Sequence, residues 1–266
     1  MTQRGFCLKK KLIREITVPL VVLNSYRMIV KPLNMKRVAI MQPTYLPWCG
    51  YFGLLDYVDQ FVFLDNVQYS HRSWQQRNRI KGPDGEILLT VPVVGNSKRG
   101  NIESVLIDSK SNLLGKHLKS LQHSYSNSKY FSEVISHLDP ILNSTTDFLS
   151  DLNIALITEI AKMLGLSTPM LKASDLGSVG VRDNLLASIC REIGATEYVS
   201  PPGSKDYLEG SKVFENSGVK LTYFDFTHPT YKQNFGSFVS HLSVVDLLFN
   251  VGAKHAAELI RSGIKK

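Results

Sequence analysis

The most constraining feature of this 266-residue sequence is a run of four apolar residues, FVFL, at positions 61–64. A strand that is apolar at every position is typical of a parallel sheet covered by helices on both faces. A second strand is predicted at Arg37–Met41, and the pattern between the two favours a short helix at Tyr51–Val58. With the FVFL strand placed at Gln60–Leu64, this order predicts a βαβ unit.

An antiparallel hairpin is expected next. The turn sequence GPDG at residues 82–85 separates strands predicted at Arg77–Lys81 and Ile87–Val93. A further strand is expected at Ile102–Ile107. Helices follow, with the predicted bounds Asn112–Gln122, Tyr130–Leu142 and Thr146–Leu164, the last ending at Gly165.

The alternation of helix and strand returns after residue 170. Glycines directly follow two of the predicted helices there, as is typical of helix ends. The predicted elements are a helix at Arg182–Ile193, a strand at Glu197–Ser200, a helix at Ser204–Ser217, a strand at Lys220–Phe226 and helices at Leu242–Asn250 and Ala253–Ser262. The sequence therefore predicts an α/β fold: a Rossmann-like, mostly parallel sheet with an antiparallel hairpin and a helical middle and C-terminal portion.

Charge divides the chain at Met35. Residues 1–34 hold seven Lys or Arg side chains and one acidic residue, whereas the rest of the chain holds 24 basic and 22 acidic side chains. We expect residues 1–34 to be a non-native or disordered N-terminal extension, and residues 35–266 to form a single α/β domain with a helical insertion at about 111–165. The nearly neutral body argues against a nucleic acid partner.

Cysteine usage and hydropathy exclude further classes. Cys7, Cys49 and Cys190 are far apart and lack the spacing of zinc ligands, so neither a disulfide framework nor a metal site is expected. No apolar run reaches the roughly 18 residues of a membrane span. We therefore expect a cytoplasmic protein without a membrane span.

The segment QPTYLPWCGYFGLL at residues 42–55 is rich in aromatic residues, Pro and Gly. It leaves the carboxyl end of the first strand, where open α/β sheets bind ligands, and a glycine at the start of the next helix lets backbone N–H groups approach an anion. The aromatic side chains would stack on a ring, or they belong to the core. The substrate-binding candidates here are Gln42, Pro43, Tyr45, Trp48, Gly50 and Tyr51.

Polar residues follow the second strand as well. Asp65 ends that strand, and a carboxylate there suits a general base, a magnesium ligand or a partner for a sugar hydroxyl; capping a turn is the alternative. Asn66 belongs to the same edge and is a substrate-binding candidate. His71, six residues after Asp65, is the histidine best placed for proton transfer. We assign Asp65 and His71 as the catalytic candidates.

A basic stripe follows in the segment SHRSWQQRNRIKG, residues 70–82. In an extended chain its cations at alternate positions point to one face and would hold a diphosphate, because Arg offers a bidentate fork. A solvated strand face is the alternative. The substrate-binding candidates from this segment are Arg72, Trp74, Arg77, Asn78, Arg79 and Lys81.

The segment EYVSPPGSKDYL at residues 197–208 repeats the pattern of a strand, a Gly loop and a helix. Such a loop cradles an anion at a helix N-terminus, although the P-loop spacing is absent. For Ser204 alone, capping the helix is the alternative. The substrate-binding candidates here are Ser200, Gly203, Ser204, Lys205 and Tyr207.

Four segments carry a resemblance to a known family: MQPTYLPWCGYFGLLDYVDQFVFLDNVQY, RSWQQRNRIK, VSPPGSKDYL and LSVVDLLFNVG. Together they resemble the WbqC-like protein family across most of residues 35–252. The resemblance implies a bacterial cytoplasmic protein, in many cases associated with biosynthesis of O-antigen or other surface polysaccharide. A weaker likeness to nucleotidylyltransferases lacks their HxGH-type motif, since no histidine lies between Gln42 and Ser70.

These features favour a transferase that adds an acyl or aminoacyl group to a nucleotide-linked amino sugar. Its partner would be a small molecule, with a nucleotide or an acyl compound as donor. Two alternatives stay open: a nucleotidyltransferase or ATP-dependent ligase of the same pathways, and a non-catalytic binding or scaffold protein.

Overall fold

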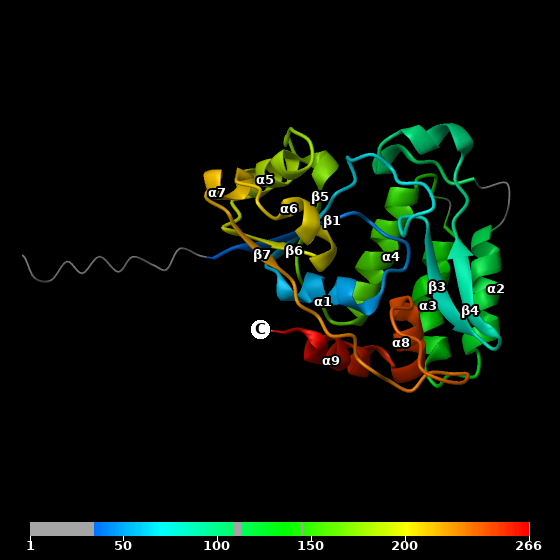
Figure 1. The fold of residues 1–266 in the computed structure, drawn as a ribbon. Helices are drawn as coiled ribbons and strands as arrows, with labels where there is room; N and C mark the ends of the chain where they lie inside the picture. Colours follow the sequence, from blue (N-terminus) through cyan, green and yellow to red (C-terminus); the bar gives the residue numbers. More distant parts are fainter. Residues whose placement is uncertain (1–34, 109–112, 145, 266) are drawn as a thin grey trace, which may run out of the picture. The chain divides into compact units, whose positions relative to one another are not determined.

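A computed structural model of the protein describes residues 35–108, 113–144 and 146–265. Five parallel strands form one sheet in the order β5-β2-β1-β6-β7 (Figure 1). The strands are β1 at Arg37–Met41, β2 at Gln60–Phe63, β5 at Met170–Lys172, β6 at Glu197–Ser200 and β7 at Lys220–Tyr223. The predicted α/β fold with a mostly parallel sheet is confirmed.

The central strands are buried on both faces, as the FVFL run predicts. In β2, Phe61 and Phe63 belong to one hydrophobic core, whereas Val62 belongs to the other. In β1, Val38 and Ile40 share the core of Val62. Alternate residues of these strands therefore support two cores, one on each face of the sheet.

Helices form the outer layers. The core of Phe61 is lined by α1 (Cys49–Tyr57), α4 (Leu149–Met163), α8 (Val244–Val251) and α9 (Ala253–Gly263), and by the helical pair α2 (Leu113–Tyr125) and α3 (Phe131–Leu142). The core of Val62 is lined by α5 (Asp183–Glu192), α6 (Lys205–Leu208) and α7 (Val213–Asn216). Figure 1 shows α1 and α5 on opposite faces of the sheet.

The hairpin forms a separate sheet of two antiparallel strands, β3 at Arg77–Gly82 and β4 at Gly85–Thr90. The turn residue Gly85 has φ +122°, a conformation that side chains disfavour. The predicted hairpin is confirmed. Its β3 packs against α2 and α8, which places the hairpin next to the helical part of the chain (Figure 1).

The strand predicted at Ile102–Ile107 is wrong. The segment begins with a short 3₁₀ helix at Ile102–Ser104, and its last two residues make isolated bridges to different partners, Leu106 to Phe148 and Ile107 to Val93. The Ile102 N–H donates to the Val67 carbonyl, whereas the Ile107 N–H donates to the Asp147 carbonyl. Because the pairing partner changes along the segment, no continuous ladder forms.

The helix predicted at Ser204–Ser217 is divided. Gly210, with φ +85°, separates α6 from α7. Strand β5 was not among the predicted elements, because three residues are too short to show a period. The predicted extension at 1–34 lies outside the described residues, as do residues 109–112 and 145 of the segment that contains the predicted insertion. The domain assignment stays a prediction.

Candidate functional site

The order of the strands predicts where a ligand binds. The chain runs from β1 outward to β2 and β5, and then returns to place β6 and β7 on the other side of β1. Connections therefore leave β1 and β6 in opposite directions, and open α/β sheets bind ligands at the carboxyl ends of two such strands. A pocket of about 510 Å³, the switch-point pocket, opens at this edge. Its lining residues are Gln42, Leu64, Asn66, Val67, Gln68, Asn101, Gly180, Val181, Arg182, Leu185, Leu186 and Tyr207.

The switch-point pocket offers several polar groups to a ligand. The side-chain oxygen of Asn66 is buried and has no hydrogen-bond partner among the described residues. Arg182 is exposed at the residue before α5, with φ +52°. Tyr207 exposes 58% of its surface, and the Gln42 side chain accepts a hydrogen bond from Gln75 at 2.9 Å. A cation, an amide oxygen and an exposed ring thus line one cavity.

A second pocket, the aromatic pocket, has a volume of about 330 Å³. Its lining residues are Met41, Thr44, Pro47, Trp48, Tyr51, Trp74, Asn78, Arg79 and His241. The loop after β1 supplies lining residues to both pockets, Gln42 to the switch-point pocket and Thr44, Pro47 and Trp48 to the aromatic pocket.

Trp48 is held in place on several sides. Its ring lies 5.5 Å from that of Phe226 in an edge arrangement, 6.0 Å from that of His228 in a stack and 5.0 Å from that of His241. A Cβ atom at Gly50 would overlap the indole. The expectation that Gly50 admits an anion to the helix N-terminus is thus corrected, since the Trp48 ring fills that space.

Arg79 is the member of the basic stripe that lines the aromatic pocket. Its guanidinium donates to Glu86 at 2.7 Å and lies 5.6 Å from the centre of the Trp74 ring. Another of its nitrogens contacts the His241 carbonyl at 3.5 Å. The terminal nitrogens Nη1 and Nη2 each carry two N–H groups and make one of these contacts each. Arg79 therefore keeps N–H donors for a ligand.

His241 lines this pocket from the C-terminal part of the chain, and the His228 ring packs against it with ring centres 4.8 Å apart. The Nδ1 of His228 lies 2.8 Å from the Pro229 carbonyl, and its Nε2 accepts the His241 backbone N–H at 3.1 Å. His228 is therefore the neutral tautomer with its proton on Nδ1. Burial is the main cause that lowers the pKa of His228.

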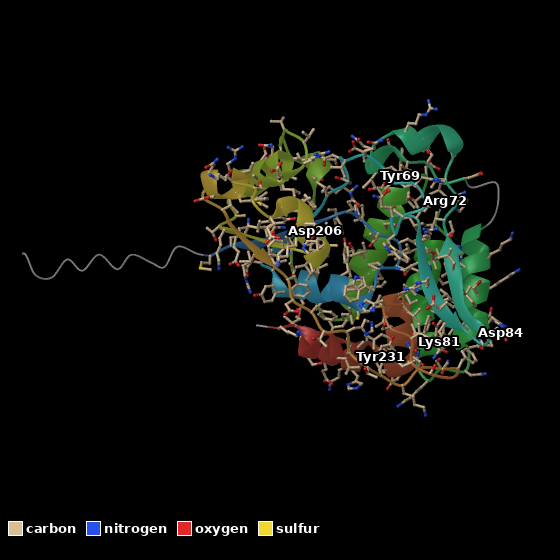
Figure 2. The ribbon with its side chains drawn as sticks, in the orientation of Figure 1. Tyr69, Arg72, Lys81, Asp84, Asp206 and Tyr231 are labelled. Atoms are coloured by element: carbon tan, nitrogen blue, oxygen red, sulfur yellow. The ribbon has the colours of Figure 1, made fainter. Side chains whose placement is uncertain are left out.

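The basic stripe does not converge on one pocket. Lys81 is buried, and its ammonium donates to the Gln233 side chain at 3.1 Å and to the Ser237 carbonyl at 2.5 Å. Figure 2 shows it near Tyr231 and away from Arg72, which is exposed and precedes β3. Arg77 lines neither pocket. A diphosphate clamp built from all three cations of the stripe is thus not formed.

The two catalytic candidates lie outside both pockets. Asp65 is 1% exposed, and its two oxygens accept hydrogen bonds from the backbone N–H and the hydroxyl of Ser174 at 2.9 and 2.6 Å. This is the capping role that the sequence left open. His71 is exposed and lines neither pocket.

The segment after β6 contributes one residue to the switch-point pocket. Ser200 and Ser204 are buried and hydrogen bonded to each other, and Ser204 donates to the Pro201 carbonyl at 2.7 Å. Gly203 and Lys205 are exposed and do not line the pocket. Since α6 has only four residues, it offers no anion site of the predicted kind. The remaining candidate, Tyr207, does line the pocket.

Two candidates from the loop after β1 and one from β3 have structural roles. The Tyr45 hydroxyl bonds His117 Nδ1 at 2.8 Å in the core, where burial lowers the pKa of that histidine to about 4. The Pro43 carbonyl accepts from Asn153 at 3.1 Å. The Asn78 amide donates to the Tyr45 and Leu46 carbonyls, although Asn78 also lines the aromatic pocket.

Several lining residues were missed by sequence reasoning. Arg182 follows a Gly-rich loop and precedes a helix, which is the pattern that singled out Gly203. His241 has no such signal, because it joins the pocket from about 200 residues away along the chain. Thr44 and Asn101 were not candidates either, although Thr44 lies between the candidates Pro43 and Tyr45.

Two negative findings bear on the site. Within residues 35–265, apart from the undescribed gaps, no three His, Cys, Asp or Glu side chains are grouped so as to hold a metal ion. In the same part of the chain, each helix is too short or too polar to cross a membrane.

Comparison with known proteins adds a family to this geometry. The model of the WbqC-like protein family matches residues 42–258. A protein of Mycobacterium tuberculosis, named "Uncharacterized protein Rv1507c", is 39% identical over 223 residues, which cover 83% of this chain and 96% of that protein. No solved structure matches the chain. The matched region includes most residues of both pockets, and the chain belongs to the WbqC-like protein family.

Proposed function

We propose that the protein is a transferase of bacterial surface-polysaccharide biosynthesis, which adds an acyl or aminoacyl group to a nucleotide-linked amino sugar. The observation that carries this proposal is that the loop after β1 lines two separate pockets. A group transfer needs two molecules held next to each other, and one loop that contacts both would supply that proximity. The proposed location is the cytoplasm, where thiols such as buried Cys49 and Cys190 stay reduced.

The switch-point pocket is the proposed site for the nucleotide. It opens at the carboxyl ends of strands whose connections leave in opposite directions, which is the usual place for a nucleotide in this fold class. Arg182 would pair with the diphosphate, with support from the amino end of the ten-residue helix α5. Tyr207 would stack on the base, and the unpartnered oxygen of Asn66 would accept a hydrogen bond from it or from the ribose.

A thermal unfolding experiment on the full chain tests the proposal. The ligands are UDP-N-acetylglucosamine, GDP-mannose, dTDP-glucose, ATP, CoA and acetyl-CoA, each with and without magnesium. A ligand at 100 times its Kd stabilises the folded state by about 2.7 kcal/mol, which is roughly 5–10 °C for a domain of this size. We expect a shift with a nucleotide sugar that Arg182→Gln removes. Arg191→Gln, an exposed arginine at the other end of α5, is the control and should keep the shift.

Other results contradict the proposal in defined ways. A shift with ATP alone, together with magnesium-dependent ATP turnover, favours an ATP-dependent ligase. If the rise in unfolding temperature persists in Arg182→Gln, the nucleotide binds outside the switch-point pocket. If no ligand changes the unfolding temperature, the non-catalytic binding or scaffold alternative replaces the transferase.

A further inference from the structure

We infer that the aromatic pocket is a subsite for a sugar ring, separate from the site of the nucleotide. The identity of that sugar, as the one linked to the nucleotide, rests on the proposed function. The pocket's walls provide an apolar surface in the form of the indoles of Trp48 and Trp74. A pyranose has one face of C–H groups, which packs against the electron-rich face of an aromatic ring, and a rim of hydroxyl groups.

The hydrogen-bonding groups of this pocket fit hydroxyl oxygens better than the edge of a base. Reading a base edge takes free side-chain amides, yet the Asn78 amide donates to two carbonyls and its oxygen accepts the Arg79 backbone N–H at 2.8 Å. The Tyr51 hydroxyl donates to the Gln42 carbonyl at 3.3 Å. The second N–H groups on Nη1 and Nη2 of Arg79 remain, and such donors suit a ring oxygen or hydroxyl.

The two indoles differ in rigidity, and together they suit a ring held from one side and covered from the other. Trp48 is fixed by Phe226 and two histidine rings. Trp74 exposes 51% of its surface and contacts the Arg79 guanidinium. An exposed indole that lines a pocket leaves its surface available to cover a ring bound there.

The positions of the two pockets support the same assignment, with the nucleotide in one pocket and the sugar in the other. Because the loop after β1 lines both pockets, a nucleotide sugar with its diphosphate at the switch point would lie across this loop. Its sugar would then enter the aromatic pocket, whose volume of about 330 Å³ is the smaller of the two. The ring that reacts and the nucleotide that anchors it would thus contact the same loop.

Tryptophan fluorescence tests this inference directly, since the chain has two tryptophans and both line the aromatic pocket. The full chain is titrated with UDP-N-acetylglucosamine, GDP-mannose and dTDP-glucose, and in parallel with UDP, GDP and dTDP. We expect a sugar-bearing nucleotide to change the tryptophan emission, whereas the same nucleotide without its sugar stabilises the protein and leaves the emission unchanged.

Variants make the assignment specific. Trp74→Leu and Arg79→Gln should each weaken binding of the sugar nucleotide by about tenfold and leave binding of the bare nucleotide unchanged. Trp74→Leu retains Trp48 as a reporter in the same pocket. Arg191→Gln is the matched control and should bind both ligands as the unchanged protein does.

Three outcomes separate this inference from the proposed function. Equal emission changes with and without the sugar would put the base in the aromatic pocket and overturn the inference. A sugar nucleotide that stabilises the protein without changing the emission overturns it as well, while the proposed function stands. If no sugar nucleotide binds, the protein is titrated with the methyl glycosides of glucose, mannose and N-acetylglucosamine. A change in tryptophan emission then supports the sugar subsite without the proposed function. No change in emission overturns both the subsite and the proposed function.

Discussion

At the scale of single residues, Gly50 shows how an apparent ligand-binding motif serves the position of a side chain. Its missing side chain leaves room for the Trp48 indole. Gly50→Ala must displace that ring, and we expect a loss of stability of about 1–3 kcal/mol, as for overpacked cores, together with altered tryptophan emission. Chemical denaturation measures the first effect. Gly95→Ala, where a Cβ meets open space, is the control; equal losses in both variants would contradict this account.

His117 gives the fold a dependence on pH. Burial lowers its pKa to about 4, and the neutral ring bonds the Tyr45 hydroxyl. In the unfolded chain a histidine has a pKa near 6.5, so the stabilisation by the neutral ring is complete above that pH and is lost as the pH falls toward 4. The separation of about 2.5 pH units corresponds to about 3 kcal/mol.

Denaturant unfolding at pH 7 and at pH 4.5 measures this effect. His117→Gln should lose less stability between the two pH values than the unchanged protein. His255→Gln, which replaces an exposed histidine, should lose as much as the unchanged protein does. An identical loss in His117→Gln would assign the acid sensitivity to other groups.

At the scale of elements, the segment between β7 and α8 depends on one glutamine. Gln233 accepts from the Lys81 ammonium and from the Val239 N–H, and it donates to the buried Asp246. Asp246 also accepts from the Tyr125 hydroxyl at 2.7 Å. This network connects β3, α2 and α8 to the segment that carries His241, so it positions one wall of the aromatic pocket.

Removing that glutamine should loosen the segment. We expect Gln233→Ala to raise the amide hydrogen exchange of residues 234–242 by about tenfold or more, since a loss of about 1.4 kcal/mol in local stability is a factor of ten. Lys232→Ala, at an exposed neighbouring position, is the control. Unchanged exchange in Gln233→Ala would show that other contacts hold the segment.

The same scale shows what the sequence can predict. The continuous apolar run correctly predicted that β2 is buried, and the GPDG turn correctly predicted the hairpin. Both signals depend only on residues close together in the sequence. Arg77, Arg79 and Lys81 do lie at alternate positions of one strand, as predicted, but they do not form one binding site. Alternate residues of a strand are almost 7 Å apart, so its far end reaches Gln233 and Ser237, partners more than 150 residues away.

At the scale of the whole described region, the two cores share their strands. Val62 belongs to one core and its neighbours Phe61 and Phe63 to the other, so neither core persists without the sheet. We expect residues 35–266 to unfold in one transition, with coincident midpoints by tryptophan fluorescence and far-ultraviolet circular dichroism. Separate midpoints would contradict the prediction that these residues form a single domain.

The loop after β1 has a thermodynamic consequence. Because it lines two cavities, a ligand that shifts this loop in one cavity changes the affinity of the other. By linkage, the factor by which the first ligand changes the affinity for the second equals the factor by which the second changes the affinity for the first. Ordered or mutually enhanced binding of two substrates would then need no moving domain, only a small displacement of one loop.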